Sequence, residues 1–114
     1  EMGAYIQDIL DLIEWANGDA KKTKWGKVRA EAGHPKPFNL KYIGIGNEDL
    51  ITDIFEERFT MIFNAIKEKY PQIEVVCALM FSPYIQEAEK IDILDPHYYE
   101  TAGWFYNNAD VYSV

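Results

Sequence analysis

The residues best suited to chemistry lie where an apolar stretch gives way to polar side chains, between Tyr42 and Asp49. The stretch begins with β-prone apolar residues and then places the amide of Asn47 beside the carboxyl group of Glu48. A buried parallel strand that delivers polar groups to a site at its C-terminal end has this pattern. A carboxyl group there, partly shielded from water, can have its pKa raised enough to act as a general acid near neutral pH.

The same residues have a simpler interpretation, because residues 46–49 also have the composition of an ordinary turn before a helix. Polar turn residues are common, so these four residues taken alone favour the turn. Gly44 and Gly46 nevertheless disfavour a helix interior, which supports a strand for the run that contains them. The rest of the chain has to decide between the two interpretations.

A second group of reactive side chains follows a later apolar run, in residues 95–100, which include His97 and Tyr99. Imidazole and aromatic groups at a strand end suit a sugar site, because aromatic faces pack on the C–H groups of a sugar ring. A histidine satisfied within an aromatic turn is the alternative. Trp25 could also stack on a sugar ring, although a loop tryptophan more often pins its loop to the body of the protein.

Other candidate residues have mainly structural interpretations. His34 has no second histidine or cysteine nearby, and no H-x-x-x-H spacing appears, so neither a metal site nor a cofactor is expected. Arg29 could bind a carboxylate or a sugar, or form a structural salt bridge. Cys77 lies inside an apolar run, where a small buried hydrophobe is expected and nothing nearby would activate the thiol.

The spacing of apolar residues predicts the elements that position these side chains. Helical spacing predicts a helix over residues 4–16 that ends at Asn17-Gly18, and another that is capped at Asp53 and stops before Pro71. Apolar, β-branched runs predict strands over residues 40–46, 72–79 and 91–94. The first two strands and the helix between them form a βαβ unit, whose strands are parallel with a right-handed crossover.

The connections between these elements are less regular. The long connection over residues 18–39 contains a short helix over residues 25–33, and a loop of this length is usually functional. Residues 80–83 are expected to form a loop and residues 84–90 a short helix at best. Residues 101–114 are polar and aromatic without a clear period, which predicts another loop.

Length and charge limit the kind of protein. The sequence has 114 residues, which suffices for one domain with its own core. Its net charge of −8 argues against nucleic-acid binding, since neutralising phosphates requires lysine and arginine. No signal peptide or membrane span is visible in the sequence. The first residues look like the middle of a domain, so the compartment of the parent protein stays open.

A longer motif suggests a family. The segment from Trp25 to Tyr42 resembles the W-x-x-x-R-A-x-x-G-H-P-x-P-F-N-x-K-Y segment of the α-L-arabinofuranosidases of glycoside hydrolase family 51, which leads into a strand with a G-N-E motif. Residues 95–99 resemble the D-x-H-x-Y motif at the end of the family's sixth barrel strand. The G-N-E triplet alone is weak, but the long segment together with the later motif is specific.

The resemblance implies an α/β fold that is part of a (β/α)8 TIM barrel, with residues 1–114 spanning about three strands, the fourth to the sixth. A complete barrel needs roughly 200 residues or more. Glu48 would be the general acid/base, and Asn47 would hydrogen-bond the sugar 2-hydroxyl. His97 and Tyr99 would lie on adjacent barrel strands and contact or orient the nucleophile. The chain departs from the family at residues 84–90, where family members usually have a longer loop and a fuller helix.

The implied activity is that of a retaining α-L-arabinofuranosidase acting on arabinose-containing polysaccharides or oligosaccharides. The family's nucleophile is a second glutamate on the seventh strand, beyond Val114, so the chain alone is expected to be inactive. Neither Asp95 nor Glu100 has the family pattern of that nucleophile. The alternative is a non-catalytic barrel fragment that binds a carbohydrate or a protein. Exposed strand edges would favour self-association in either case.

Overall fold

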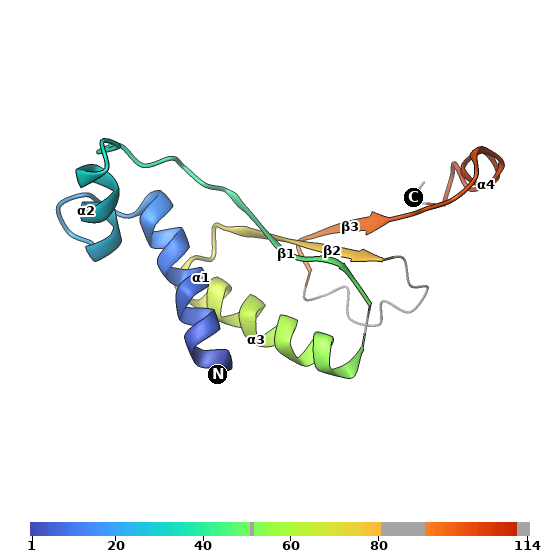
Figure 1. Cartoon of the computed structure of the whole chain (residues 1–114), viewed down its shortest axis with the longest axis horizontal. Helices are drawn as coiled ribbons and strands as arrows, with labels where there is room; N and C mark the ends of the chain where they lie inside the picture. The colour runs from blue at the N-terminus through green and yellow to red at the C-terminus, as the bar shows by residue number, and fades with distance from the viewer. Residues whose placement is uncertain (51, 81–90, 112–114) are drawn as a thin grey trace.

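A computed structural model of the chain describes residues 1–50, 52–80 and 91–111. The described elements, in order, are α1 (Met2–Asn17), α2 (Lys24–Glu31), β1 (Tyr42–Asp49), α3 (Asp53–Lys69), β2 (Glu74–Met80), β3 (Ile93–His97) and α4 (Ala102–Asn107). The molecule is elongated, with extents of 54 × 28 × 23 Å. Helices α1 and α2 lie at one end, and the segment that follows β3 carries α4 away at the other end (Figure 1).

The three strands form one parallel sheet in the order β1-β2-β3. The predicted parallel arrangement of the βαβ unit is therefore confirmed. Strand β1 continues past the predicted end at residue 46 as far as Asp49, and β3 extends past residue 94 to His97. Pro96 lies within β3, where its missing N–H is tolerated because β3 is an edge of the described sheet.

Helices α1 and α3 confirm the two predicted helices, but the start of α3 differs from the prediction. Thr52, not Asp53, is the N-cap, and its side-chain oxygen accepts a hydrogen bond from the backbone N–H of Phe55 at 3.1 Å. Both residue types cap helices well, and the threonine comes first in the chain. Asp53 instead occupies the first helical position, where the helix dipole favours its negative charge.

The short helix predicted in the long connection is α2, which begins after the N-cap Thr23. It ends with Gly33 at a φ of +96°, a left-handed conformation that glycine adopts without penalty. The backbone N–H groups of Gly33 and His34 donate to the carbonyls of Ala30 and Arg29. This pair of hydrogen bonds is a Schellman motif, which satisfies the last carbonyl groups of the helix.

The prediction of a plain loop after residue 100 is wrong, because residues 102–107 form α4. The hydroxyl oxygen of its N-cap, Thr101, accepts a hydrogen bond from the backbone N–H of Trp104 at 3.2 Å. The amide side chain of Asn108 donates to the carbonyl of Trp104 at 2.8 Å. Side chains therefore hold both ends of a helix that has no buried residue. The expectations for residues 81–90 lie outside the described residues.

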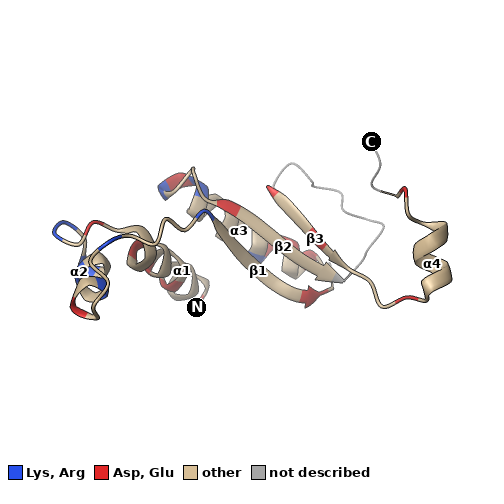
Figure 2. Cartoon of the chain, turned by 90° about the horizontal axis from the view of Figure 1, so that it is seen from above, with Lys and Arg blue, Asp and Glu red and all other residues tan. Residues whose placement is uncertain are grey.

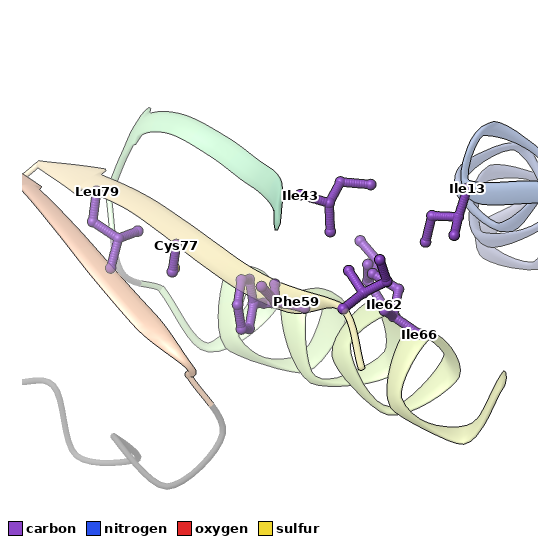
Figure 3. Close-up of a cluster of buried hydrophobic side chains, with 9 residues drawn as sticks. Ile13, Ile43, Phe59, Ile62, Ile66, Cys77 and Leu79 are labelled. Carbon is purple, nitrogen blue, oxygen red and sulfur yellow. The ribbon is translucent and has the colours of Figure 1, made fainter. Parts of the chain in front are cut away.

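The hydrophobic core lies between one face of the sheet and the helices α1 and α3 (Figure 3). Alternate residues of β2, namely Val75, Cys77 and Leu79, point into it. The predicted aromatic stripe of α3 faces the same core, with Phe59 buried and Phe55 and Phe63 partly buried. Burial raises the pKa of the Cys77 thiol to about 11, so this cysteine is an inert core residue, as predicted.

On the amino side of the sheet, polar side chains are bonded to the backbone. The amide of Asn17 donates to the carbonyl of Leu40 at 2.8 Å and accepts from its N–H at 2.7 Å. Lys67 donates to the carbonyl of Ile73 at 2.7 Å and pairs with Asp92 at 2.5 Å. Asp92 in turn accepts from the backbone N–H of Val75 at 2.8 Å. These contacts join α1 to the residues just before β1, and α3 to the residues just before β2 and β3.

Charged side chains are unevenly distributed. Figure 2 shows basic residues around α2 and acidic ones at the carboxyl end of β1. Within the described residues, no helix is both long and apolar enough to cross a membrane.

Candidate active site

The carboxyl end of β1 has an irregular backbone. The pairing of β1 with β2 shifts between Ile45 and Asp49, and Gly46 has a φ of +84°. A Cβ atom at Gly46 would lie 2.7 Å from Oδ2 of Asp49 and 3.2 Å from the carbonyl of Ala78, so glycine is needed there. Glu48 itself has a φ of +56°, which is uncommon for a residue with a side chain. Such irregularities often redirect a side chain near a functional site.

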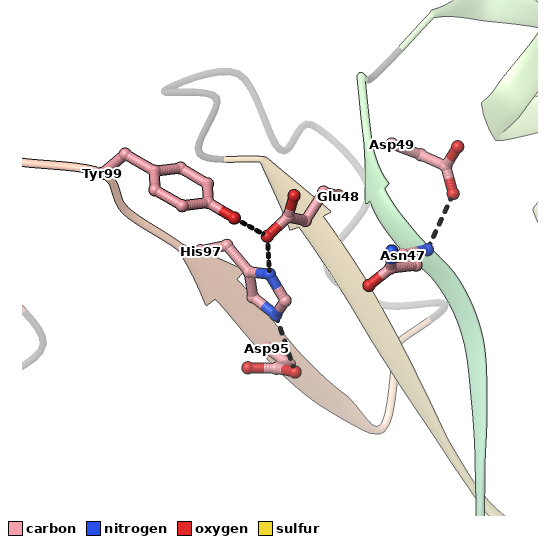
Figure 4. A network of polar contacts seen from close by, with 6 residues as sticks. All are labelled: Asn47, Glu48, Asp49, Asp95, His97 and Tyr99. Carbon is pink, nitrogen blue, oxygen red and sulfur yellow. Dashed lines mark hydrogen bonds and ion pairs between the residues drawn. The ribbon is translucent and has the colours of Figure 1, made fainter.

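The redirected carboxylate of Glu48 receives two side-chain contacts from a different part of the chain (Figure 4). His97 Nδ1 lies 3.0 Å from Glu48 Oε1, and the Tyr99 hydroxyl donates a hydrogen bond to the same oxygen. His97 is the last residue of β3, and Tyr99 follows two residues later. His97 and Tyr99 therefore come from one segment, not from adjacent strands as expected. They reach Glu48 across the carboxyl end of β2, because β2 lies between β1 and β3 in the sheet.

A second carboxylate contacts the other side of the imidazole ring. Asp95 Oδ2 lies 3.1 Å from His97 Nε2. The side chains of Glu48 and His97 are about one-third exposed, whereas that of Asp95 is 54% exposed. We call these residues, Glu48, Asp95, His97 and Tyr99, the Glu48 cluster. Among the described residues, no group of three or more His, Cys, Asp or Glu side chains is placed to hold a metal ion.

The hydrogen bonds of the Glu48 cluster shift the pKa values of its members. The hydrogen bonds from Tyr99 and then His97 lower the pKa of Glu48 below its ordinary value. The hydrogen bonds to Glu48 and Asp95 raise the pKa of His97, and the bond to Glu48 raises the pKa of Tyr99. The expected increase in the pKa of Glu48 is therefore not found in this chain, because the partly exposed carboxylate accepts two hydrogen bonds that favour its ionised form.

Asn47 and Trp25 lie outside the Glu48 cluster. The side chain of Asn47 is exposed, and its backbone N–H donates to Asp49 Oδ2 at 3.0 Å. Trp25 lies in α2, at the opposite end of the molecule (Figure 1). Its backbone N–H donates to Glu14 at 3.1 Å, and Lys24 Nζ lies 4.7 Å from its ring centre. The structure thus places Trp25 away from the Glu48 cluster, and its backbone N–H, not its ring, makes this hydrogen bond to α1.

Arg29 has neither of the roles considered for it. Its side chain is fully buried and, among the described residues, donates only to backbone carbonyls, those of Trp15 at 2.8 Å, Ala16 at 3.4 Å, His34 at 2.9 Å and Pro35 at 3.2 Å. The first two carbonyls belong to the last turn of α1, which has no helical donors for them. Arg29 is therefore a structural cap for α1. His34 is exposed with its ring 5.4 Å from that of Phe38, in line with a surface role.

Sequence reasoning missed the contact between Asp95 and His97. Asp95 was considered only as a second catalytic carboxylate. The separation of Asp95 and His97 by two positions could have predicted this contact, because side chains at positions i and i+2 of a strand lie on the same face. The signal was hidden because the third strand was expected to end at residue 94, before both side chains.

A strand-end carboxylate that is hydrogen-bonded to an imidazole and a phenol defines a candidate acid/base site on a parallel sheet. The family model described as the alpha-L-arabinofuranosidase 1 domain matches residues 1–114. The chain therefore belongs to the alpha-L-arabinofuranosidase family.

Two curated relatives illustrate this membership. The chain is 43% identical to an extracellular exo-alpha-L-arabinofuranosidase from Streptomyces chartreusis, over 95% of this chain and 14% of the relative. It is 40% identical to alpha-L-arabinofuranosidase 2 from Arabidopsis thaliana, over 86% of this chain and 14% of the relative. The chain thus spans about one-seventh of the length of these relatives.

Solved structures agree with the sequence comparison. An arabinose-bound GH51 α-L-arabinofuranosidase superimposes with a TM-score of 0.72 and 31% identity, over 96% of this chain and 17% of that chain. The arabinose complex of an α-L-arabinofuranosidase from Thermotoga maritima gives a TM-score of 0.71 and 25% identity, over 94% of this chain and 25% of that chain. The resemblance to family 51 is therefore confirmed.

Proposed function

We propose that this chain is the acid/base segment of a retaining α-L-arabinofuranosidase that acts on arabinose-containing glycans. The observation that carries the proposal is the carboxylate of Glu48, which lies at the end of a parallel strand and shares one oxygen between His97 and Tyr99. Family membership supports the substrate class, because the relatives are named for this activity and two of the similar structures contain arabinose.

The proposed fold of the parent domain is a (β/α)8 barrel, with β1, β2 and β3 as its fourth, fifth and sixth strands. The parallel sheet and the helix that packs on one of its faces support this proposal. The site of such a barrel lies at the carboxyl ends of the strands, which is where Glu48 and His97 are found.

In the proposed mechanism, Glu48 protonates the departing sugar oxygen and later removes a proton from the attacking water. Asn47 hydrogen-bonds the sugar 2-hydroxyl, a contact that strengthens in the transition state. The nucleophile is a second carboxylate, about 5 to 5.5 Å from the first in retaining enzymes, and comes from outside this chain. Its negative charge would raise the pKa of Glu48, opposing the hydrogen bonds that lower this pKa here.

The experiment that tests this role replaces Glu48 with glutamine in a complete barrel that contains the segment. We expect turnover of substrates with poor leaving groups to fall about 10²- to 10⁴-fold, since general acid catalysis contributes that much. Activated aryl arabinofuranosides should lose less, and azide should partly restore their turnover. Glu100→Gln is the matched control, because Glu100 is an exposed carboxyl group just beyond the same site. Equal loss on every substrate without azide rescue would contradict the proposal.

The purified 114-residue chain gives a second test. We expect it not to release nitrophenol from an aryl α-L-arabinofuranoside, because it lacks the proposed nucleophile. Turnover that disappears in the Glu48→Gln variant would place a second carboxylate within these residues or in a partner copy. The alternative, a non-catalytic carbohydrate- or protein-binding fragment, predicts that the complete barrel is inactive as well.

Self-association is the remaining proposal about partners. Strands β1 and β3 are the two edges of the described sheet, and edge strands carry unpaired backbone groups. In the isolated chain these edges are available to a second copy. Analytical ultracentrifugation would then show a mass that rises with concentration, and a monomer at high concentration would rule the pairing out.

A further inference from the structure

The strongest unassigned feature of the site is the position of Asp95. Asp95 and His97 are two residues apart on β3, so their side chains lie on the same face of the sheet. The imidazole ring bridges two carboxylates, with Nε2 3.1 Å from Asp95 Oδ2 and Nδ1 3.0 Å from Glu48 Oε1 (Figure 4). Asp95 does not contact Glu48 itself, so any influence on that carboxylate passes through the ring.

The two carboxylates determine which form of the ring fits between them. An ionised carboxylate only accepts hydrogen bonds, and a neutral imidazole has one donating and one accepting nitrogen. A neutral ring would therefore direct one lone pair at a carboxylate oxygen. The imidazolium form, which donates from both nitrogens, satisfies Glu48 and Asp95 together.

Other charged groups near the ring are few. Tyr99 donates to the same oxygen of Glu48 that faces His97. Strand β2 lies between β1 and β3, and its one charged residue, Glu74, pairs with Tyr42 at the amino end of the sheet. Within the described part of the chain, Glu48 and Asp95 are the titratable groups whose hydrogen bonds reach this ring.

We propose that Asp95 is a positioning residue for Glu48. Its carboxylate holds the imidazolium form of His97 in the orientation that places Nδ1 against Oε1 of Glu48. This inference rests on the proposed acid/base role of Glu48. It adds that Glu48 transfers the proton, whereas Asp95 and His97 set its protonation state. The imidazolium favours the ionised form of Glu48, which is the form that accepts a proton from water in the second half of a retaining reaction. Asp95 controls this preference without touching the substrate.

The direction in which the pKa of Glu48 changes in an Asp95 variant tests the proposal without any measurement of activity. In the 114-residue chain, NMR titration would follow the carboxyl group of Glu48 and the ring of His97 in the Asp95→Asn variant. Removing a negative charge acts directly through space to lower the pKa of a nearby carboxyl group. Losing the orientation that Asp95 gives the imidazolium ring would instead weaken the hydrogen bond from Nδ1 to Glu48 and raise the pKa of Glu48. We expect this increase, together with a titration of His97 that moves to lower pH.

The controls separate positioning from general charge effects. Asp8→Asn makes the same charge change on an exposed residue of α1 that is not a member of the Glu48 cluster, and should move neither titration. In a His97→Gln background, Asp95→Asn should no longer raise the pKa of Glu48. A pKa of Glu48 that falls or stays unchanged in the single variant would overturn the proposal.

A measurement on the unmodified chain remains if the variant fails to fold. At pH 6.5, the ordinary pKa of histidine, the ¹⁵N shifts of the His97 ring should show more than half imidazolium. Half or less would overturn the inference. Because none of these measurements uses a substrate, they can fail while Glu48 remains the acid/base, and they can succeed in an inactive protein.

Discussion

On the amino side of the sheet, the cations Arg29 and Lys67 donate to backbone carbonyls, whereas at the carboxyl end Glu48 is bonded by two other side chains. The first kind of contact fixes the main chain, because the bonded carbonyls belong to helix and strand ends. The second kind fixes only side chains, and its members are partly exposed. The comparison shows which polar groups hold the fold and which are free to take part in chemistry.

The largest expected effect is on the amino side. Arg29→Met should lower the free energy of unfolding by about 3 to 5 kcal/mol, because it removes a fully buried side chain that donates to the partly buried carbonyls of Trp15, His34 and Pro35. Arg29→Lys should cost less, since it keeps the charge but loses the planar fork. Urea denaturation of the chain measures both. A loss below about 1 kcal/mol for the methionine variant would break the distinction between the two ends.

A smaller loss is expected at the Lys67 contact. Lys67→Met removes a hydrogen bond to Ile73 and an ion pair with Asp92, and should cost about 1 to 2 kcal/mol. Lys69→Met is the matched control. Lys69 pairs with Glu14 at 3.9 Å and is 46% exposed, so its loss should cost about 0.5 kcal/mol or less. Equal effects in denaturation would mean that bonding to the backbone is not what distinguishes Lys67.

The carboxyl end should contribute to stability only within a pH window. The pKa of Glu48 is lowered from 4.5, so its contribution is present above pH 4.5 and is lost as the pH falls through its folded value. The pKa of His97 is raised from 6.5, so its contribution is present below pH 6.5 and is lost as the pH rises through its folded value. The difference in denaturation midpoint between the unmodified chain and His97→Gln should therefore be largest between pH 4.5 and 6.5. A constant difference from pH 4 to pH 9 would contradict this assignment.

The smallest effect on stability is expected for Tyr99→Phe, because Tyr99 is 72% exposed. The variant should nevertheless raise the pKa of Glu48 toward 4.5, since it removes the hydrogen bond that lowers it most. Carboxyl ¹³C titration measures this change. Tyr106→Phe is the control, with a side chain 85% exposed in α4. An unchanged titration of Glu48 in the Tyr99 variant would show that the hydrogen bond does not persist in solution.

Patterns of apolar residues predicted the elements well because burial imposes them. The stripe that includes Phe59 and Ile62 and the alternation through Val75 and Cys77 each match a face that packs in the core. Element ends were harder to predict. Thr52 and Asp53 are both good caps, and only the position of the first turn decides between them. The helix α4 could not be predicted from apolar spacing, because it has no buried face and is stabilised by side-chain caps at its ends.

Motifs indicated Glu48, His97 and Tyr99 as site residues, and the structure brings these three together. Their mutual contacts could not be predicted, because they depend on the shift in register after Ile45 and on the left-handed conformation of Glu48. The direction of the pKa shift of Glu48 depends on the same contacts. Trp25 was grouped with the site only by residue type, and nothing in the sequence gives its distance from Glu48.

The paired hydrogen bonds between Asn17 and Leu40 have a consequence for variation in this family. A side-chain amide that both donates and accepts imitates a strand neighbour, and it joins two residues 23 positions apart. These hydrogen bonds thus hold the two ends of the long connection together, whatever the sequence and length of the residues between them. Insertions or deletions inside the connection can then change its length while β1 still starts at the same place. Sequence divergence around α2 would leave the position of Glu48 in the fold unchanged as long as the hydrogen bonds between Asn17 and Leu40 are kept.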